Sequence, residues 1–192
     1  NIQRTSRTLP KVAPPKIKCA HDGHAHAQKN PLPYIREAYV DVPHAVIELA
    51  ADHVDPHLIG AANGAVSALS LARGIQNFQS GGLVHNIEGV GNVALAASSG
   101  IGAYQAFLGD HHEHGHHHGL SLTGGLEMVH GAAEIAIGGI EVKEEGRTAI
   151  GLARIVKGGA VLAAQLIPGA GPISGLVHLG AVLTVTALDP KH

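Results

Sequence analysis

The chain has 192 residues, a net charge of −2 and one cysteine. The near-neutral balance argues against nucleic acid as a partner, and a single cysteine excludes an internal disulfide framework. Aromatic residues make up 3% of the chain, tryptophan is absent and glycine occurs 26 times. Because aromatic side chains normally supply much of a large core, this chain must bury itself through small and aliphatic side chains.

Residues 1–43 are rich in proline, with six of the ten prolines of the chain. Proline at this density prevents helix formation and favours an extended or polyproline conformation. We expect an arm that either lies along a partner or is a plain flexible tail. In the first case the apolar anchors would be Leu32, Tyr34, Ile35 and Tyr39, because an extended peptide gains specificity from pockets for its side chains.

Helical patterning is expected from residue 44 onwards, and no stretch shows convincing period-two alternation. The expected segments are 44 to about 54, 57–78, 83–108, 120–142, 144–167 and 173–188. Glycines expected at helix contacts are Gly60 and Gly64, whose GxxxG spacing suits close packing, and Gly171 and Gly175. The predicted fold is all-α, with Gly/Ala-rich apolar hairpins that assemble into an oligomeric tube or bundle.

The C-terminal part of the chain is the most apolar. Residues 158–188 contain no Asp, Glu, Lys or Arg, and an uncharged run longer than about 18 residues is the usual threshold for a membrane span. The Pro-Gly-Ala-Gly-Pro break at 168–172 and the missing tryptophan favour helices that dip into the bilayer or enclose one another. The lone cysteine is compatible with a reducing compartment, and we expect the protein at the cytoplasmic face of the cell membrane.

The sequence also carries an internal echo, in which two segments recur with few changes: 67–73 as 148–154, and 80–85 as 174–178. Chance similarity in Ala/Gly-rich sequence is one explanation. The other is a duplicated helical hairpin that carries a histidine into each apolar face. The echo ends its first segment at Arg73 and Arg154, which we expect at helix ends, close to an interface or to lipid phosphates.

Three histidines, His85, His130 and His178, lie on small-residue apolar segments, where a polar group is costly unless it is hydrogen-bonded. One interpretation is a hydrogen bond between helices. The other is an internal hydrophobic chamber, in which the imidazoles contact the carbonyl of a lipophile such as a quinone. The carboxylates that could then act as proton partners are Glu88, Glu127 and Glu134.

Two further histidine clusters raise the question of a metal. The expected loop 110–119 holds His111, His112, His114, His116, His117 and His118, and the arm holds Cys19, His21, His24 and His26. Imidazole and thiolate suit Zn, Ni or Cu, but a tract interrupted by glycine does not fix tetrahedral geometry. We therefore keep two interpretations of the tract, a divalent-metal site and a solvated loop that buffers protons.

No phosphate-binding loop, dinucleotide fingerprint or nucleophile elbow occurs in the sequence, and we expect a non-catalytic protein. The layout resembles the membrane-associated stalk subunit of oxygen-tolerant, high-affinity nickel–iron hydrogenases. In that family a proline-rich arm grips the enzyme, and Gly/Ala-rich helices of several copies form a hydrophobic tube that delivers menaquinone.

This resemblance assigns the arm to residues 1–43 and the tube to the helical regions 44–109 and 120–192, which flank the loop 110–119. It implies three partners: large redox subunits, further copies of the chain, and membrane lipid with its quinone. Two alternatives accompany it. The first is a metal-handling protein, and the second is a glycine-zippered integral protein like those of bacterial magnetosome membranes, which the chain also resembles.

Overall fold

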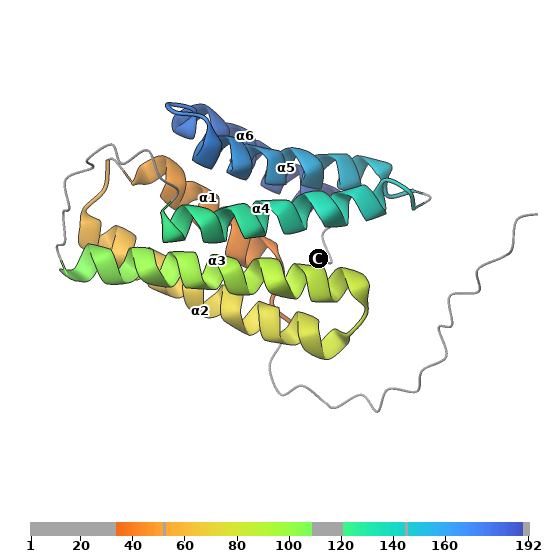
Figure 1. Ribbon diagram of the computed structural model, residues 1–192, viewed down its shortest axis with the longest axis horizontal. Coiled ribbons are helices and arrows are strands. Elements are labelled where there is room, and N and C mark those ends of the chain that lie inside the picture. The colour runs from red at the N-terminus through yellow and green to blue at the C-terminus, as the bar shows by residue number, and fades with distance from the viewer. Residues whose placement is uncertain (1–33, 52, 109–120, 145, 190–192) are drawn as a thin grey trace, which may run out of the picture. The chain divides into compact units, whose positions relative to one another are not determined.

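The computed structural model of the chain describes residues 34–51, 53–108, 121–144 and 146–189 (Figure 1). These residues form helices and no strands, so the all-α prediction is confirmed for this part of the chain. The anchor Leu32, the cluster from Cys19 to His26 and the tract from His111 to His118 lie outside the described residues. The helices are α1 (Ala38–Ala50), α2 (Pro56–Ser80), α3 (Leu83–Leu108), α4 (Leu122–Glu141), α5 (Thr148–Leu166) and α6 (Gly171–Leu188).

Helix α1 begins earlier than proline content predicts. Residues 38–43 were expected to be extended, but they are helical, with Pro43 inside the helix. Pro43 has no N–H and therefore costs the helix one hydrogen bond. That loss is offset by the burial of apolar side chains on one face of α1, those of Val40, Ala45 and Ile47.

Local sequence explains where several helices start and stop. The Asp55 carboxylate accepts hydrogen bonds from the backbone N–H groups of His57, at 2.8 Å, and Leu58, as expected of a residue that caps a helix N-terminus. The Ser121 hydroxyl oxygen caps α4 in the same way, by accepting from the Gly124 N–H at 3.0 Å. Gly81, with a φ of 70°, ends α2 in a conformation that glycine adopts without strain.

The helices form a closed ring of contacts. Each helix packs against the next along the chain, and α1 packs against both α2 and α6. The long helices are paired as two hairpins, α2 with α3 and α4 with α5, and α3 lies beside α4 (Figure 1). One face of α1 is thereby directed towards the inner faces of the other helices.

Glycines allow α4 and α5 to approach until their backbones touch. A Cβ atom placed on Gly151 would lie 2.6 Å from the Gly138 carbonyl oxygen and 2.7 Å from the Val142 nitrogen. One placed on Gly131 would lie 2.9 Å from the Gly158 carbonyl oxygen. Such small-residue contacts are typical of closely packed membrane helices.

The four glycines expected at helix contacts have different surroundings. A Cβ on Gly60 would lie 2.9 Å from the Ala106 Cβ, and one on Gly175 would lie 2.9 Å from Leu49 Cδ2. At Gly64 the nearest atom, on Ala103, would be 4.0 Å away, and at Gly171 nothing lies within 4 Å. Gly60 and Gly175 therefore lie at close helix contacts, Gly64 is in ordinary contact and Gly171 is open.

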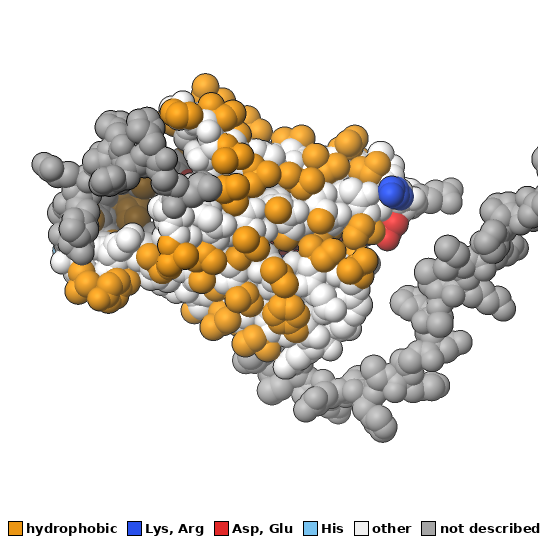
Figure 2. Space-filling view, viewed as in Figure 1, with side chains coloured by type: hydrophobic (Ala, Val, Ile, Leu, Met, Phe, Trp, Pro, Cys, Tyr) orange, Lys and Arg blue, Asp and Glu red, His pale blue; other side chains and the backbone are white. Residues whose placement is uncertain are grey.

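The distribution of polarity is inverted with respect to a water-soluble protein. Large apolar side chains are exposed on all of the described helices, and on the face in Figure 2 they spread along the helices while charged side chains are visible at one end. Three helices, α2, α5 and α6, are long and apolar enough to cross a membrane. Among the most exposed side chains are Leu58, Leu83, Tyr104, Leu122, Ile173 and Leu176.

The α4–α5 contact leads to a first prediction. Gly151→Ala should destabilise the bundle by about 1–3 kcal/mol, because the new methyl group meets backbone atoms that cannot rotate away. The neighbouring change Gly139→Ala is the matched control, since nothing lies within 4 Å of its Cβ position, and it should be neutral or stabilising by up to about 1 kcal/mol. Thermal unfolding followed by circular dichroism measures both. Equal stability of the two variants would contradict the close contact.

Candidate functional site

The interior is organised around the carboxylate of Glu37, which lies at the N-terminal end of α1. Arg154 of α5 donates to both of its oxygen atoms, from Nη1 at 2.9 Å and from Nη2 at 2.5 Å. Lys157, one helical turn further along α5, donates to Oε1 at 2.6 Å. A third cation, Arg73 of α2, places Nη2 3.7 Å from Oε2. One carboxylate thus joins α1 to both α2 and α5.

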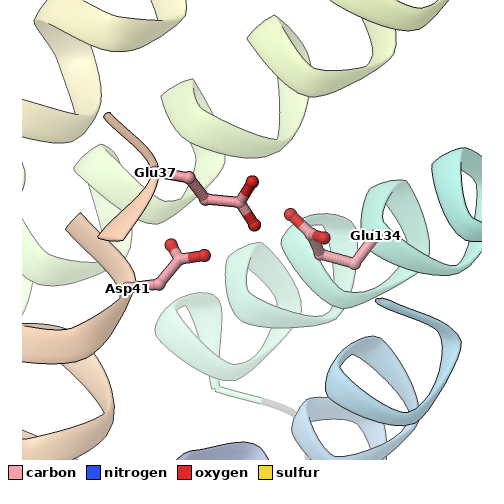
Figure 3. A group of neighbouring side chains, drawn as sticks. All are labelled: Glu37, Asp41 and Glu134. Atoms are coloured by element: carbon pink, nitrogen blue, oxygen red, sulfur yellow. The ribbon is translucent and has the colours of Figure 1, made fainter. Parts of the chain in front are cut away.

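The ammonium group of Lys157 lies among three carboxylates, those of Glu37, Asp41 and Glu134, which point towards one another (Figure 3). The three carboxylates offer oxygen atoms within 4.8 Å of one another, a spacing that suits a cation. Lys157 Nζ contacts Asp41 and lies 3.0 Å from Glu134 Oε1. The lysine ammonium thus supplies a positive charge to all three carboxylates.

The network continues towards the start of α5. Arg154 donates from Nη1 to Glu134 Oε2 at 2.9 Å and places Nε 3.1 Å from Glu141 Oε2. Glu141 also accepts from Arg147 Nη2 at 2.6 Å, and the same guanidinium contacts Asp189 at 3.0 Å. A row of ion pairs therefore runs from the α4–α5 turn into the interior.

A second branch lies between α2 and α3. The Arg73 guanidinium, which is fully buried, donates to the Glu88 carboxylate and to the Ile35 backbone carbonyl, the latter at 2.5 Å. The Tyr34 ring lies over the same guanidinium, 5.6 Å from its central carbon. The backbone N–H of Ile35 donates to Gln76 Oε1 at 3.0 Å. Tyr34 and Ile35, expected as anchors for a partner, thus contact α2 of their own chain, whereas Tyr39 is exposed.

Burial makes this network costly unless every charge is paired. Burial alone would raise the pKa of the Glu37 carboxyl, but the adjacent cations of Lys157, Arg154 and Arg73 outweigh it and hold that pKa well below its ordinary value. The ion pairs of Glu37 therefore contribute stability above the ordinary carboxyl pKa, and that contribution is lost as the pH falls through the lowered value.

A cluster of three histidines adjoins the network: His44 of α1, His130 of α4 and His178 of α6. All three are buried, with exposed fractions of 4%, 2% and 1%. The His44 ring centre lies 6.5 Å from that of His130 and 5.8 Å from that of His178, in edge-to-face arrangements. Glu48, one turn after His44, accepts from His178 Nδ1 at 2.8 Å. Three helices therefore bring their imidazoles together.

Four of the residues expected to line a lipophile chamber are buried, but they belong to different groups. His130 and His178 share the histidine cluster, Glu134 belongs to the Lys157 cluster and Glu88 pairs with Arg73. Within one copy, the described interior around these residues is lined by charges and imidazoles.

The two other expected lining residues lie further out. Glu127 accepts from the Ser98 hydroxyl at 2.9 Å and also from the Gln165 amide. His85 is 40% exposed, with Nδ1 4.0 Å from Glu88 Oε2. His85 therefore lies at the edge of the Arg73 branch and apart from the histidine cluster.

The placement predicted for the two echoed arginines was wrong. Arg73 and Arg154 were expected at helix ends near lipid phosphates, but they lie inside the bundle, with exposed fractions of 0% and 1%. The physical reason is Glu37, whose carboxylate pairs with both of them. The echoed segments therefore direct equivalent arginines to one acceptor.

Sequence reasoning missed the acidic side of the network. Glu37, Asp41, His44 and Glu48 recur at four- and three-residue spacing, which places them on one face of a helix. The proline content of residues 1–43 predicts an extended arm that includes Glu37 and Asp41, and this prediction separates them from His44 and Glu48 in the expected helix. Lys157 directly precedes the uncharged run 158–188 and lies outside it, so the pattern of that run gives no sign that this lysine is buried.

A cavity of about 320 Å³ lies beside the C-terminal half of α5 and contacts His178 of the histidine cluster. Its lining comes from α1, α5 and α6, and includes Glu48, Gln165, Ser174 and His178. His53, in the turn after α1, is an exposed part of the same lining. The cavity gives a small polar solute or an ion a route to the Glu48–His178 pair.

The ion pairs of Glu37 lead to a second prediction. Glu37→Gln should destabilise the protein by about 3–5 kcal/mol, because removing one partner leaves buried cations uncompensated. The control is Glu144→Gln, which removes an exposed pair whose atoms, Arg147 Nε and Glu144 Oε2, are 3.6 Å apart, and it should cost less than about 1 kcal/mol. Chemical denaturation in detergent compares the two. A Glu37 variant as stable as the control would show that the network does not hold the fold.

Comparison of the chain with protein-family models, with curated proteins and with solved structures finds no match. The function is therefore inferred from the contacts, burial and charges of this chain.

Proposed function

We propose that the protein is a non-catalytic, membrane-embedded scaffold that assembles with copies of itself and with a redox enzyme. The observation that carries the proposal is the inverted polarity of the bundle. Apolar side chains such as Leu58, Tyr104 and Leu176 are exposed, whereas Arg73, Arg154 and Lys157 are fully buried. Water as the surrounding solvent would favour the opposite distribution, and exposed apolar surface on this scale marks a membrane or protein contact.

The length of α5, which carries Arg154 and Lys157, suits a membrane. Between Arg147 and Gln165 the chain rises about 27 Å, at about 1.5 Å per residue, and the hydrocarbon core of a bilayer is about 30 Å thick. Lys157 and Arg154 lie within this length and face inwards. Ionisable residues in membrane helices are found on such inward faces, where they pair with one another.

The close glycine contacts of α4 and α5 also support this environment. Lipid chains supply no hydrophobic force between helices, so membrane helices associate through close backbone packing and interhelical polar contacts. Gly151 and Gly138 supply the first kind of contact, and the pair Arg154–Glu134 supplies the second.

The resemblance to hydrogenase stalk subunits supplies a candidate cargo, menaquinone. The interior of one copy holds charges, so we place the quinone chamber between copies, where outward apolar side chains of several bundles would meet. The arm of residues 1–43 would then engage the large redox subunits. The cytoplasmic face of the cell membrane is the proposed location.

Membrane insertion is the first test of this proposal. The protein should stay in the membrane pellet during alkaline carbonate extraction. Leu176→Lys should lower the pelleted fraction, because Leu176 is 64% exposed on α6 and a lysine in mid-membrane costs about 2.5–3.5 kcal/mol on insertion scales. Val54→Lys, in the turn between α1 and α2, is the control and should pellet like the parent. Release of the parent protein into the carbonate supernatant would overturn the proposal.

The position of the quinone is tested separately. Native mass spectrometry in mild detergent, with lipid extraction of the same sample, should find quinone with oligomers bound to redox subunits. Dilution of the detergent complex into single copies should release the quinone, because the chamber is placed between copies. A single copy that retains stoichiometric quinone would contradict that placement, and a quinone-free assembly would remove the cargo from the proposal.

A further inference from the structure

In the histidine cluster five of the six ring nitrogens make no hydrogen bond, although His44 Nε2 lies 3.4 Å from Glu48 Oε1. Among the described residues, the buried ring nitrogens without a hydrogen bond include His44 Nδ1 and Nε2, His130 Nδ1 and Nε2, and His178 Nε2. A buried polar group without a partner costs about 1–3 kcal/mol. Three adjacent imidazoles in this condition form a site suited to a ligand that accepts nitrogen lone pairs.

Glu48 orients one of these rings for such a ligand. His178 Nδ1 lies 2.8 Å from Glu48 Oε2, so the proton of the neutral ring belongs on Nδ1, where it is donated to the carboxylate. This tautomer leaves the lone pair of Nε2 available, and Nε2 is the atom without a partner. A carboxylate that holds one nitrogen of a histidine while the other binds a metal is the usual outer contact of metal-ligating histidines.

The spacing of the rings approaches that of a metal site. Zinc–nitrogen bonds of about 2.0–2.1 Å in a tetrahedron place the ring centres of two imidazole ligands about 5 Å apart. The observed separations from the His44 ring are 5.8 and 6.5 Å. Both separations exceed the value expected for two zinc ligands, so binding requires rotation of the rings about their side-chain bonds.

Charge and access favour a cation at this place. In the described interior five carboxylates are buried against three permanent cations, and Glu48, with a side chain 24% exposed, adds a further carboxylate beside the histidines. The Glu37–Asp41–Glu134 cluster already holds Lys157, whereas the carboxylate of Glu48 faces imidazoles. The cavity of about 320 Å³ that contacts Glu48 and His178 provides an entry path.

We propose that His44, His130 and His178 bind one divalent first-row transition-metal ion, with Glu48 as the positioning residue for His178. Three imidazoles beside a carboxylate suit zinc, copper, iron or nickel and disfavour calcium and magnesium, which prefer oxygen ligands. Of the three proposed ligands, His178 also lines the cavity. The proposed ligands are different residues from the histidine tract of 111–118 and from the cysteine–histidine cluster of 19–26.

The test uses the full chain in detergent, with Zn²⁺ as the probe. The six tract histidines, His111 to His118, are first replaced by asparagine, and Cys19, His21, His24 and His26 by serine or asparagine, so that neither cluster contributes. In this background, competition with a chromophoric chelator should find one tight Zn²⁺ per chain. Co²⁺ should give the intense visible absorption of a tetrahedral site, and Zn²⁺ should raise the unfolding temperature.

Variants then assign the ligands. His130→Ala should weaken Zn²⁺ binding at least 100-fold and abolish the shift in unfolding temperature. Glu48→Gln should weaken Zn²⁺ binding about 10- to 100-fold. If His130→Ala does not fold, Glu48→Gln still tests whether Zn²⁺ binds at the histidine cluster. The matched control is His85→Ala, since His85 occupies the echoed position but lies at the edge of the bundle with a 40% exposed side chain, and it should bind like the parent.

Absence of tight Zn²⁺ binding in the substituted background would overturn the proposal. Equal losses in His85→Ala and Glu48→Gln would overturn it as well, because binding would then not depend on the cluster. The measurement is made in detergent and does not depend on membrane insertion or on a quinone. Failure of the membrane proposal and failure of the metal site are therefore distinguishable.

Discussion

The structure depends on pairing the buried cations of α5 with the carboxylate of Glu37. Arg154 and Lys157 both donate to this one side chain, from positions 117 and 120 residues later in the chain. Two charges removed from water are tolerated only when geometry and hydrogen bonds compensate for the lost hydration. Helix α1 and the residue before it are therefore a required part of the bundle, because without Glu37 and Asp41 Lys157 would lose two of its three carboxylates and Arg154 one of three.

The same constraint explains why the exterior is apolar. Charged and imidazole side chains take up much of the inward faces of α1, α4 and α5, so many large aliphatic residues of the helices face outwards. The apolar cluster of the interior is correspondingly small, built on Val40, Ile47, Val66 and Leu95. An environment of lipid or of neighbouring copies gives the outward side chains a favourable contact, and close glycine contacts supply packing between helices.

Two kinds of polar interior thus adjoin each other along α1 and α4. Around Lys157 the carboxylates and cations are mutually paired, which makes that part of the network a structural element. Around His44, His130 and His178 five of the six ring nitrogens make no hydrogen bond, and a cavity reaches His178. The two parts therefore have different roles. A network whose polar groups are all paired stabilises the fold but has no free atoms for a ligand, whereas imidazole nitrogens without hydrogen bonds next to a cavity can bind one.

Local pattern in the sequence determined the helical class, the approximate extent of five helices and the apolar character that α2, α5 and α6 display. It also singled out His130, His178, Glu88 and Glu134, because an ionisable residue in an apolar segment is conspicuous at any position. Only the tertiary structure decided that Arg73 and Arg154 face inwards, that residues 38–43 are helical despite Pro43, and that His44 joins the other two histidines. The physical reason is the distance along the chain over which each effect acts. Helical periodicity depends on residues that are close in sequence, whereas the pairing of Glu37 with Lys157 depends on which helix faces pack together in the folded bundle.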